Sequence, residues 1–252
     1  MLDDLRLALA LADTADAITV RHFQSATLAV RTKDDHTPVS EADEAVERTI
    51  RERLARERPD DAIVGEEFGA SGCSQRRWII DPIDATKNYV RGIPIFATLI
   101  ALESAGTVQA GVVSAPALSR RWWAARGCGA FCNGRTIHVS GVSSVEEAHL
   151  SYDDYAGFEK HGLGGNFLEL ARRCVRTRAF GDFWSYMLVA EGAVDIAIEP
   201  EVGLWDMAAI QPIVEEAGGR FTDLSGRPRA DGGSGVATNG RLHDEVLAVL
   251  QK

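Results

Sequence analysis

A short acidic segment at the end of a buried strand constrains this chain more than any other feature. The apolar run Trp78-Ile79-Ile80 leads directly into Asp81-Pro82-Ile83-Asp84-Ala85-Thr86. Two carboxylates held close together repel each other, and burial disfavours their charged forms, so at least one resists ionisation unless a positive partner is present. A hard divalent cation is the simplest partner, because it prefers carboxylate and carbonyl oxygens. The segment therefore predicts the floor of a magnesium site.

The alternative partner for this pair is a basic side chain. Arg76, Arg77 and Lys87 lie near enough in the sequence to form a salt bridge with Asp81 or Asp84. Asp84 could instead cap a helix, but Asp81 would then stay beside apolar strand residues without a cation. A metal ion that serves both carboxylates explains the segment more economically.

Length and charge limit the classes of function. The 252 residues suffice for one large domain or two fused subdomains, and the net charge of −10 argues against nucleic acid as the main partner. No apolar stretch approaches the ~20 residues that span a bilayer, so we expect no membrane partner. The start of the chain is acidic where a signal peptide would be basic, and the four cysteines form no CxxC motif. We therefore expect a cytoplasmic protein with unpaired thiols.

Hydrophobic periodicity predicts a mixed chain. Predicted helices cover 2–23, 40–58, 167–174, 183–191, 206–217 and the end of the chain from about 242; predicted strands cover 62–64, 78–80, 97–102, 108–114, 121–125, 127–133, 194–198 and 235–238. Pro212 predicts a kink or a late start in its helix. The stretch 141–144 predicts a boundary between an N-terminal α+β subdomain, 1–142, and a C-terminal α/β subdomain, 143–252. Because strict βαβ alternation is absent, the predicted class is layered α+β.

Further acidic residues fall at the ends of predicted elements. Glu66 follows a strand, and Asp206 opens a helix. Each has an ordinary structural interpretation, Glu66 as a loop anion and Asp206 as a helix cap. Asp43 likewise fits a capping box with Ser40. A magnesium site at the acidic segment would explain Glu66 and Asp206 together with the strand-end pair.

Separated motifs in a fixed order resemble the inositol monophosphatase family. The motifs are Gly65-Glu66-Glu67, then Trp78 to Thr86, then Leu204-Trp205-Asp206-Met207-Ala208-Ala209 and Glu216-Ala217-Gly218-Gly219. The match runs nearly end to end, from the first helix to Ala237-Thr238-Asn239-Gly240. The resemblance implies a five-layer αβαβα sandwich of the inositol monophosphatase/fructose-1,6-bisphosphatase type. It also implies a homodimer that hydrolyses a small phosphorylated metabolite with magnesium and is commonly inhibited by lithium.

The resemblance also implies which oxygens hold the metal. Glu66, Asp81 and the carbonyl of Ile83 would hold one ion, and Asp81, Asp84 and Asp206 would hold a second. Two such ions can stabilise both the entering and the leaving oxygen of an in-line displacement. Catalytic roles fall to Glu66, Asp84 and Thr86.

Other roles implied by the resemblance concern water and phosphate. Glu66 and the hydroxyl of Thr86 would orient the attacking water, and the amides of Ala85 and Thr86 would bind phosphate oxygens. Asp43 and Lys33 match positions near a weaker third metal, so two or three Mg²⁺ ions are expected per site. The family has glycine where this chain has Ala85. If the backbone there requires a positive φ, alanine costs about 1–2 kcal/mol.

The choice of ester rests on a further resemblance, to the histidinol-phosphatase branch found in actinobacteria. The segments that carry it are 84–89, 114–116 and 178–186. Asp182 and Glu199 fall at family positions that face the leaving group. Histidinol phosphate carries an ammonium and an imidazole, and a pair of carboxylates would favour such a cation through charge-assisted hydrogen bonds. Asp182 could instead be the N-cap of the helix that follows it.

Arg178 could bind substrate or phosphate, or form a structural ion pair. The five tryptophans are expected in the core. The leading hypothesis is a magnesium-dependent histidinol-phosphate phosphatase of histidine biosynthesis, and the runner-up is an inositol-1-phosphate or broad sugar-phosphate phosphatase. A hypothesis of another class is a weakly active, metal-binding regulatory protein in which Ala85 has blunted turnover. Restoring glycine would then raise the rate by orders of magnitude.

Overall fold

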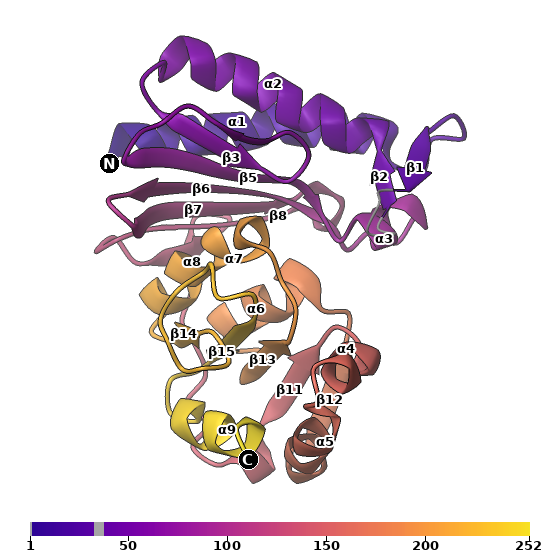
Figure 1. Cartoon of the computed structure of the whole chain (residues 1–252). Coiled ribbons are helices and arrows are strands. Elements are labelled where there is room, and N and C mark those ends of the chain that lie inside the picture. The colour runs from indigo at the N-terminus through magenta and orange to yellow at the C-terminus, as the bar shows by residue number, and fades with distance from the viewer. Residues whose placement is uncertain (1, 33–37) are drawn as a thin grey trace.

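Helices and sheets alternate in five layers in the computed structural model, which describes residues 2–32 and 38–252 (Figure 1). This arrangement confirms the predicted αβαβα sandwich. The first layer contains α1 (Leu2–His22) and α2 (Glu41–Glu57), which cover one face of the larger sheet. α2 begins with the predicted capping box, because Ser40 Oγ accepts a hydrogen bond from Ala42 N–H and Asp43 Oδ2 accepts one from Ser40 N–H.

The second layer is a mixed sheet with the strand order β10-β9-β8-β7-β6-β5-β3-β4. Its strands are β3 (Ala62–Gly65), β4 (Gly69–Ser71), β5 (Arg76–Asp84), β6 (Ala97–Ser104), β7 (Thr107–Ala115), β8 (Arg120–Ala125), β9 (Ala130–Cys132) and β10 (Arg135–Thr136). β5 runs parallel to β3 and antiparallel to β6. The predicted strand 127–133 is shorter than expected, because Gly127 and Gly129 adopt positive φ in a turn that precedes β9.

A bulge at the end of β5 sets the direction of its last side chains. Asp81 pairs with Leu99 and Asp84 pairs with Ala97, so β5 has one more residue in this interval than β6. Residues three apart on a regular strand face opposite sides of the sheet, whereas one inserted residue returns them to the same side. Pro82 is tolerated here because a bulge leaves a backbone position without a ladder hydrogen bond. Asp81 and Asp84 therefore both face the interior between the two sheets.

The third layer lies between the sheets and contains α6 (Asp182–Ala190), α7 (Leu204–Ala208) and α8 (Ile210–Glu216). The helix predicted at 206–217 is divided at Ala209, and Pro212 falls in the first turn of α8, where its missing N–H costs little. A Cβ at Gly111 of β7 would lie 2.1 Å from the carbonyl oxygen of Ala209. Glycine at this position therefore lets the α7–α8 junction rest directly on the larger sheet.

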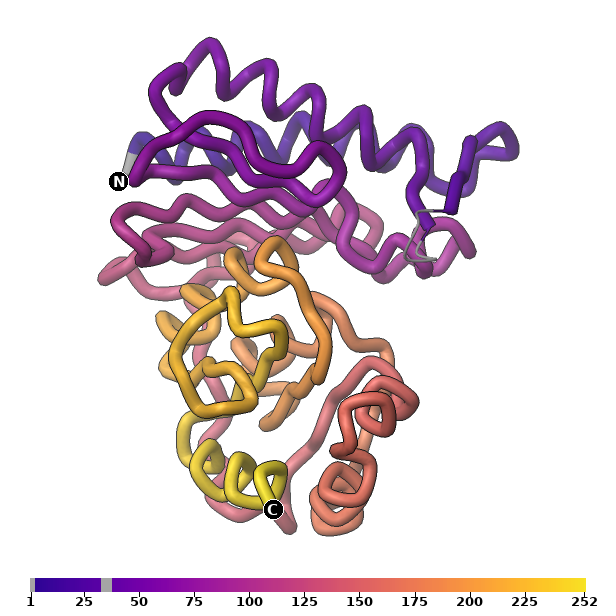
Figure 2. The backbone as a smooth tube through the Cα atoms, viewed as in Figure 1, coloured from indigo at the N-terminus to yellow at the C-terminus, as the bar shows by residue number. Residues whose placement is uncertain are grey.

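The fourth layer is the sheet β12-β11-β13-β15-β14, and the fifth layer covers its outer face. The strands are β11 (His149–Tyr152), β12 (Arg176–Ala179), β13 (Ile196–Glu199), β14 (Arg220–Thr222) and β15 (Gly235–Thr238); the helices are α4 (Tyr155–Lys160), α5 (Gly164–Arg173) and α9 (His243–Leu250). α5 starts earlier than the predicted 167–174. The chain passes from the larger sheet to the smaller one through residues 137–148 (Figure 2). The division into subdomains at 142/143 stays a prediction, since one apolar cluster includes residues of both sheets.

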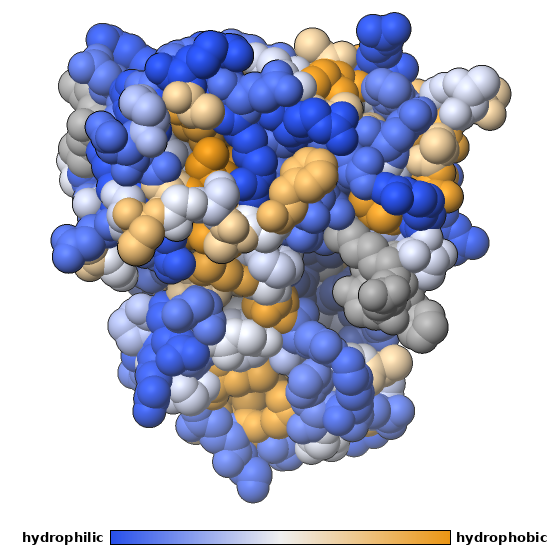
Figure 3. Space-filling view, turned by 45° about the horizontal axis from the view of Figure 1, so that its top comes forward, coloured by the Kyte–Doolittle hydropathy of each residue, from blue (hydrophilic) through white to orange (hydrophobic). Residues whose placement is uncertain are grey.

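Shorter elements complete the described chain. They are β1 (Val30–Thr32), β2 (Pro38–Ser40), α3 (Thr86–Val90) and the 3-10 turns η1 (Pro116–Leu118) and η2 (Val145–Glu147). α1 has the length of a membrane span but lacks the apolar character, and no other described helix combines the two. The face in Figure 3 is largely hydrophilic, with dispersed apolar areas.

His243, at the start of α9, is completely buried between two threonine hydroxyls. Thr222 Oγ1 donates to the carbonyl of Asp223 at 2.8 Å, so it accepts from His243 Nε2–H at 2.9 Å. The other ring nitrogen, Nδ1, then accepts from Thr238 Oγ1 at 3.1 Å. This network suits the neutral imidazole, and burial lowers the pKa of His243 to about 4.

We expect this histidine to destabilise the fold in mild acid. The unfolded chain binds a proton near the ordinary pKa of about 6.5, whereas the folded chain binds it only near 4, so stability is lost as the pH falls below 6.5. Denaturant titrations at pH 7 and pH 5 should differ by about 2 kcal/mol more in the wild type than in His243→Gln. Parallel pH profiles for the two proteins would contradict the assignment.

Ala85, between β5 and α3, has φ 65° and ψ 45°, so the backbone does require the left-handed conformation. Ala85→Gly should raise the free energy of unfolding by about 1 kcal/mol, because the methyl group is strained there. The matched control is Ala17→Gly in the exposed face of α1, which should lower it by about 1 kcal/mol. Equal losses in both variants, measured by denaturant titration, would show that position 85 is not strained.

Candidate functional site

A cavity of about 680 Å³ opens between the two sheets, where the molecule is hollowed in Figure 3. The end of β5 and the start of α3 form one wall. The residues after β11, the start of α6, the end of β13 and the first turn of α7 form the other. Gly157 and Lys160 of α4 also line it, so the cavity is built by segments from four of the five layers. Carboxylates dominate its lining: Glu66, Asp81, Asp84, Asp153, Asp154, Asp182, Glu199, Glu201 and Asp206.

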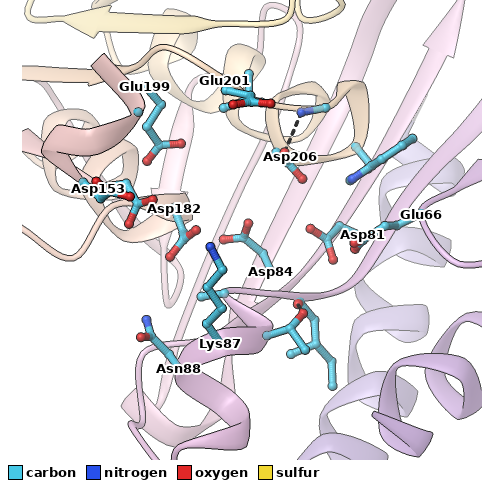
Figure 4. Close-up of a pocket in the computed structure, with 18 of the residues that line it drawn as sticks. Glu66, Asp81, Asp84, Lys87, Asn88, Asp153, Asp182, Glu199, Glu201 and Asp206 are labelled. Atoms are coloured by element: carbon cyan, nitrogen blue, oxygen red, sulfur yellow. Dashed lines mark hydrogen bonds between the residues drawn. The ribbon is translucent and has the colours of Figure 1, made fainter. Parts of the chain in front are cut away.

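One group of carboxylates converges at the bulge. An oxygen of Asp81, of Asp84 and of Asp206 all lie within 4.8 Å of one another, and these side chains point toward each other in Figure 4. Asp81 Oδ1 is buried and has no hydrogen-bond partner among the described residues. Burial, followed by the charges of nearby carboxylates, raises the pKa of Asp81 and Asp84 well above the usual range. An all-oxygen set with an orphaned buried carboxylate oxygen fits a hard divalent cation.

Hydrogen bonds from backbone N–H groups orient two of these acids, Asp84 and Asp206. Asp84 Oδ2 accepts the N–H of Phe183 at 2.8 Å, which ties the end of β5 to the start of α6. Asp206 Oδ2 accepts the N–H of Gly203 at 2.6 Å. Asp206 does not open α7 as predicted, because the helix begins at Leu204 and Gly203 is its N-cap. Asp206 is the third helical residue; its carboxylate binds back to the N-cap amide and also belongs to the converging group.

Thr86 stands beside this group at the first position of α3. Its Oγ1 lies 2.8 Å from the carbonyl oxygen of Ile83 and 3.3 Å from Asp43 Oδ1, and it can donate to either. Burial raises the pKa of Asp43 to about 6, although its hydrogen bonds with Ser40 oppose the shift. Asp43 therefore combines its capping role with a contact to the edge of the site.

A second group of carboxylates lies at the other end of the cavity. Asp182, Glu199 and Asp153 gather there, and the amine of Lys87 extends toward Asp182 and Asp84 (Figure 4). Burial, then the charges of Asp153 and Asp206, raises the pKa of Asp182 to about 8, while Lys87 opposes the shift. Burial and the charge of Asp182 also raise the pKa of Glu199 well above normal. This end of the cavity is therefore short of positive charge.

The arginines predicted as alternative partners bind elsewhere. Arg76 pairs with Asp4 at 2.6 Å and with Asp61 at 2.9 Å, and Arg77 pairs with Glu103 at 2.8 Å. The salt-bridge interpretation of the strand-end pair is therefore wrong for both arginines. Lys87 lines the cavity, but among the described residues its amine forms no ion pair within 4.0 Å.

The structure brings most of the predicted site residues to one cavity. Those that line it are Glu66, Asp81, Ile83, Asp84, Ala85, Thr86, Asp182, Glu199 and Asp206. Arg178 is exposed on β12 and does not line the cavity. Lys33 lies outside the described residues. The interpretation of Asp182 as an N-cap is wrong, because Gly181 is the N-cap and Asp182 is the first helical residue, with φ 50°.

Sequence reasoning missed Asp153 and did not place Trp205 at the site. Asp153 follows β11, and a Cβ at Gly181 would lie only 2.3 Å from Cβ of Asp153, so the β11 loop and the start of α6 pack tightly together. No strand was predicted directly before Asp153, so no predicted element could have placed this residue at the site. Trp205 lines the cavity, although the tryptophans were expected in the core; its position beside Asp206 was the available signal.

Comparisons with known proteins agree with this geometry. The model of the inositol monophosphatase family matches residues 2–252. A histidinol-phosphatase of Streptomyces coelicolor is 56% identical, covering 100% of this chain and 98% of its own length. A histidinol-phosphatase of Mycobacterium tuberculosis is also 56% identical, with 98% of each chain covered. The solved IMPase of Thermotoga maritima is 35% identical and superposes with a TM-score of 0.89, covering 99% of this chain and 97% of that one. The chain therefore belongs to the inositol monophosphatase family.

Proposed function

We propose that this chain hydrolyses histidinol phosphate to histidinol and inorganic phosphate, with Mg²⁺ as its cofactor. The observation that carries the proposal is the acidic second end of the cavity, in a chain 56% identical over its full length to two proteins named histidinol-phosphatase. A runner-up, hydrolysis of inositol 1-phosphate or sugar phosphates, is supported by the family and by more distant relatives. The surplus of buried carboxylates at the second end favours a cationic leaving group over a neutral polyol.

The converging carboxylates are the proposed cofactor site. Glu66, Asp81 and the carbonyl of Ile83 would hold one ion, and Asp81, Asp84 and Asp206 would hold another. When bound, Mg²⁺ supplies positive charge that stabilises the phosphoryl oxygens and favours deprotonation of the attacking water. A third ion beside Asp43 stays a prediction.

The remaining steps belong to side chains and backbone of this chain. Glu66 and Thr86 would orient the attacking water, Thr86 by accepting one of its hydrogens while donating to Ile83 or Asp43. The N–H groups of Ala85 and Thr86, at the open end of α3, donate to phosphate oxygens. Ala85, with its left-handed backbone, and Thr86 both line the cavity, which supports this role.

The leaving alcohol would be recognised by charge. Asp182 and Glu199 accept hydrogen bonds from the ammonium or imidazolium of histidinol, and Asp153 adds a third negative group. Burial and the charges of neighbouring carboxylates raise the pKa values of Asp182 and Glu199, and a bound cation would lower them again.

We also propose that the protein is a cytoplasmic homodimer. β12 is bonded to β11 along one side, and its other side carries no strand among the described residues. Val175 and Phe180, at the two ends of β12, are 62% and 49% exposed. An open strand edge flanked by large exposed apolar side chains is suited to contact with a second copy. The four cysteines are unpaired, as expected of a reducing compartment.

Phosphate release should identify the ester. With Mg²⁺ present, kcat/KM for histidinol phosphate should exceed that for inositol 1-phosphate and for fructose 1,6-bisphosphate, and EDTA should abolish all three activities. Asp182→Asn should lower the preference for histidinol phosphate by roughly ten- to a hundredfold, because one hydrogen bond to a charged group contributes about 1.5–3 kcal/mol. Asparagine tolerates the positive φ of this position. A higher kcat/KM for inositol 1-phosphate would support the runner-up instead.

Asp84→Asn should separate catalysis from folding. Loss of a proposed metal ligand should lower kcat/KM by more than about a hundredfold, since changes next to a ligand already cost 10–100-fold. The unfolding temperature of the metal-free variant should not fall, because asparagine can still accept the Phe183 N–H while one buried charge is removed. Asp244→Asn, on an 86% exposed side chain, is the control for both measurements. Full activity of Asp84→Asn would contradict the proposed role.

Ala85→Gly distinguishes an active enzyme from the weakly active regulatory protein. In a competent enzyme the variant should change kcat by only a few fold, because alanine already adopts the left-handed conformation. A rise of orders of magnitude would favour the regulatory hypothesis.

A further inference from the structure

The turn that presents Glu66 is fixed by a carboxylate outside the cavity. Glu47 of α2 is completely buried, and its Oε2 accepts the N–H of Glu67 at 2.7 Å. Its Oε1 accepts the N–H of Phe68 at 3.2 Å. One side chain thus binds the two backbone amides that directly follow Glu66.

Arg51, one helical turn later, completes this arrangement. Its Nε donates to Glu47 Oε1 at 2.7 Å and its Nη1 donates to Ser71 Oγ at 2.9 Å. Its Nη2 donates to the carbonyl oxygen of Gly69. The Glu47–Arg51 pair therefore holds α2 to the turn between β3 and β4 and to β4 itself.

Gly65, the residue before Glu66, leaves room for this carboxylate. A Cβ at Gly65 would lie 2.1 Å from Glu47 Oε1, so only glycine leaves room for the side chain in its present position. On the opposite side, the N–H of Glu66 donates to the carbonyl oxygen of Ile80 at 3.2 Å. Ile80 directly precedes Asp81, so the backbone of Glu66 is held between α2 and the strand that carries the acidic segment.

We propose that Glu47 is a positioning residue, which fixes the backbone turn carrying Glu66 and thereby sets the affinity of the site for divalent cations. The inference rests on the proposed function, in which Glu66 is a metal ligand. A buried carboxylate is costly unless it is fully bonded, and Glu47 uses its oxygens on the turn rather than on the cavity. Groups that orient a ligand of this kind commonly control metal affinity by 10–100-fold.

The first test is calorimetric titration of metal-free protein with Mn²⁺ and with Mg²⁺. Glu47→Gln keeps one acceptor oxygen but turns an NH₂ group toward one of the two amides, so it should weaken binding roughly ten- to a hundredfold. The Mg²⁺ concentration for half-maximal phosphatase activity should rise by the same factor, while KM for the ester at saturating Mg²⁺ should change little.

The matched control is Glu57→Gln in the same helix. Glu57 also accepts from an arginine four residues away, Arg53 Nε at 2.7 Å, but this pair lies on the surface and far from the turn. Metal affinity should be unchanged in this variant. Equal affinities in Glu47→Gln and in the wild type, with the variant folded, would overturn the inference.

Gly65→Ala provides a second route if Glu47→Gln does not fold. The three atoms nearest to the added methyl group all belong to the end of the Glu47 side chain, so the variant should displace the carboxylate without removing it. It should weaken metal binding about as much as Glu47→Gln, and the double variant should lose little more, because both changes break the same contact. Additive losses, or unchanged affinity in Gly65→Ala, would overturn the inference.

Glu66→Gln separates this inference from the proposed function. Weaker metal binding in Glu66→Gln with normal binding in Glu47→Gln would reject the positioning role alone. Normal binding in both variants would reject Glu66 as a ligand, and with it the proposed metal site. Weaker binding in both supports the two proposals together.

Discussion

Repulsion among buried carboxylates is the interaction on which the rest of this structure depends. Asp81 and Asp84 have strongly raised pKa values because burial and neighbouring charges act in the same direction. The chain tolerates this cost at one place, where a bulge turns both side chains to the same face of β5. A regular strand would have separated them across the sheet and removed most of the repulsion. The fold therefore maintains an unfavourable cluster of carboxylates, as expected of a binding site for cations.

The layered architecture explains how acids distant in sequence join that cluster. The α7–α8 junction rests on β7 through Gly111, which fixes the height of Asp206 above the larger sheet. Phe183 N–H binds Asp84, so α6 is joined to the end of β5 by a backbone contact. These contacts connect the larger sheet to the middle helices near the proposed metal site. The smaller sheet contributes only to the opposite end of the cavity.

Much of this could be predicted from local patterns. The alternation of apolar residues predicted the main helices and strands, and the two aspartates around Pro82 indicated the site. The bulge could not be predicted, because its effect depends on the register with β6. The same applies to Asp153: its place in the cavity depends on how the loop after β11 packs against the start of α6, and no short-range pattern records that. Arg178 was chosen by resemblance alone, and the structure places it on an exposed strand.

The two ends of the cavity are built by different layers of the fold, and this has a consequence for how substrate specificity can change during evolution. The proposed cation end is built by β5, α7 and the β3–β4 turn, all packed on the larger sheet, whereas Asp153 and Glu199 come from the ends of β11 and β13. If Asp153 and Glu199 recognise the alcohol as proposed, substitutions at the ends of β11 and β13 would alter which alcohol is accepted without moving the proposed cation end. Such modularity would let one scaffold acquire new substrates while its chemistry stays intact.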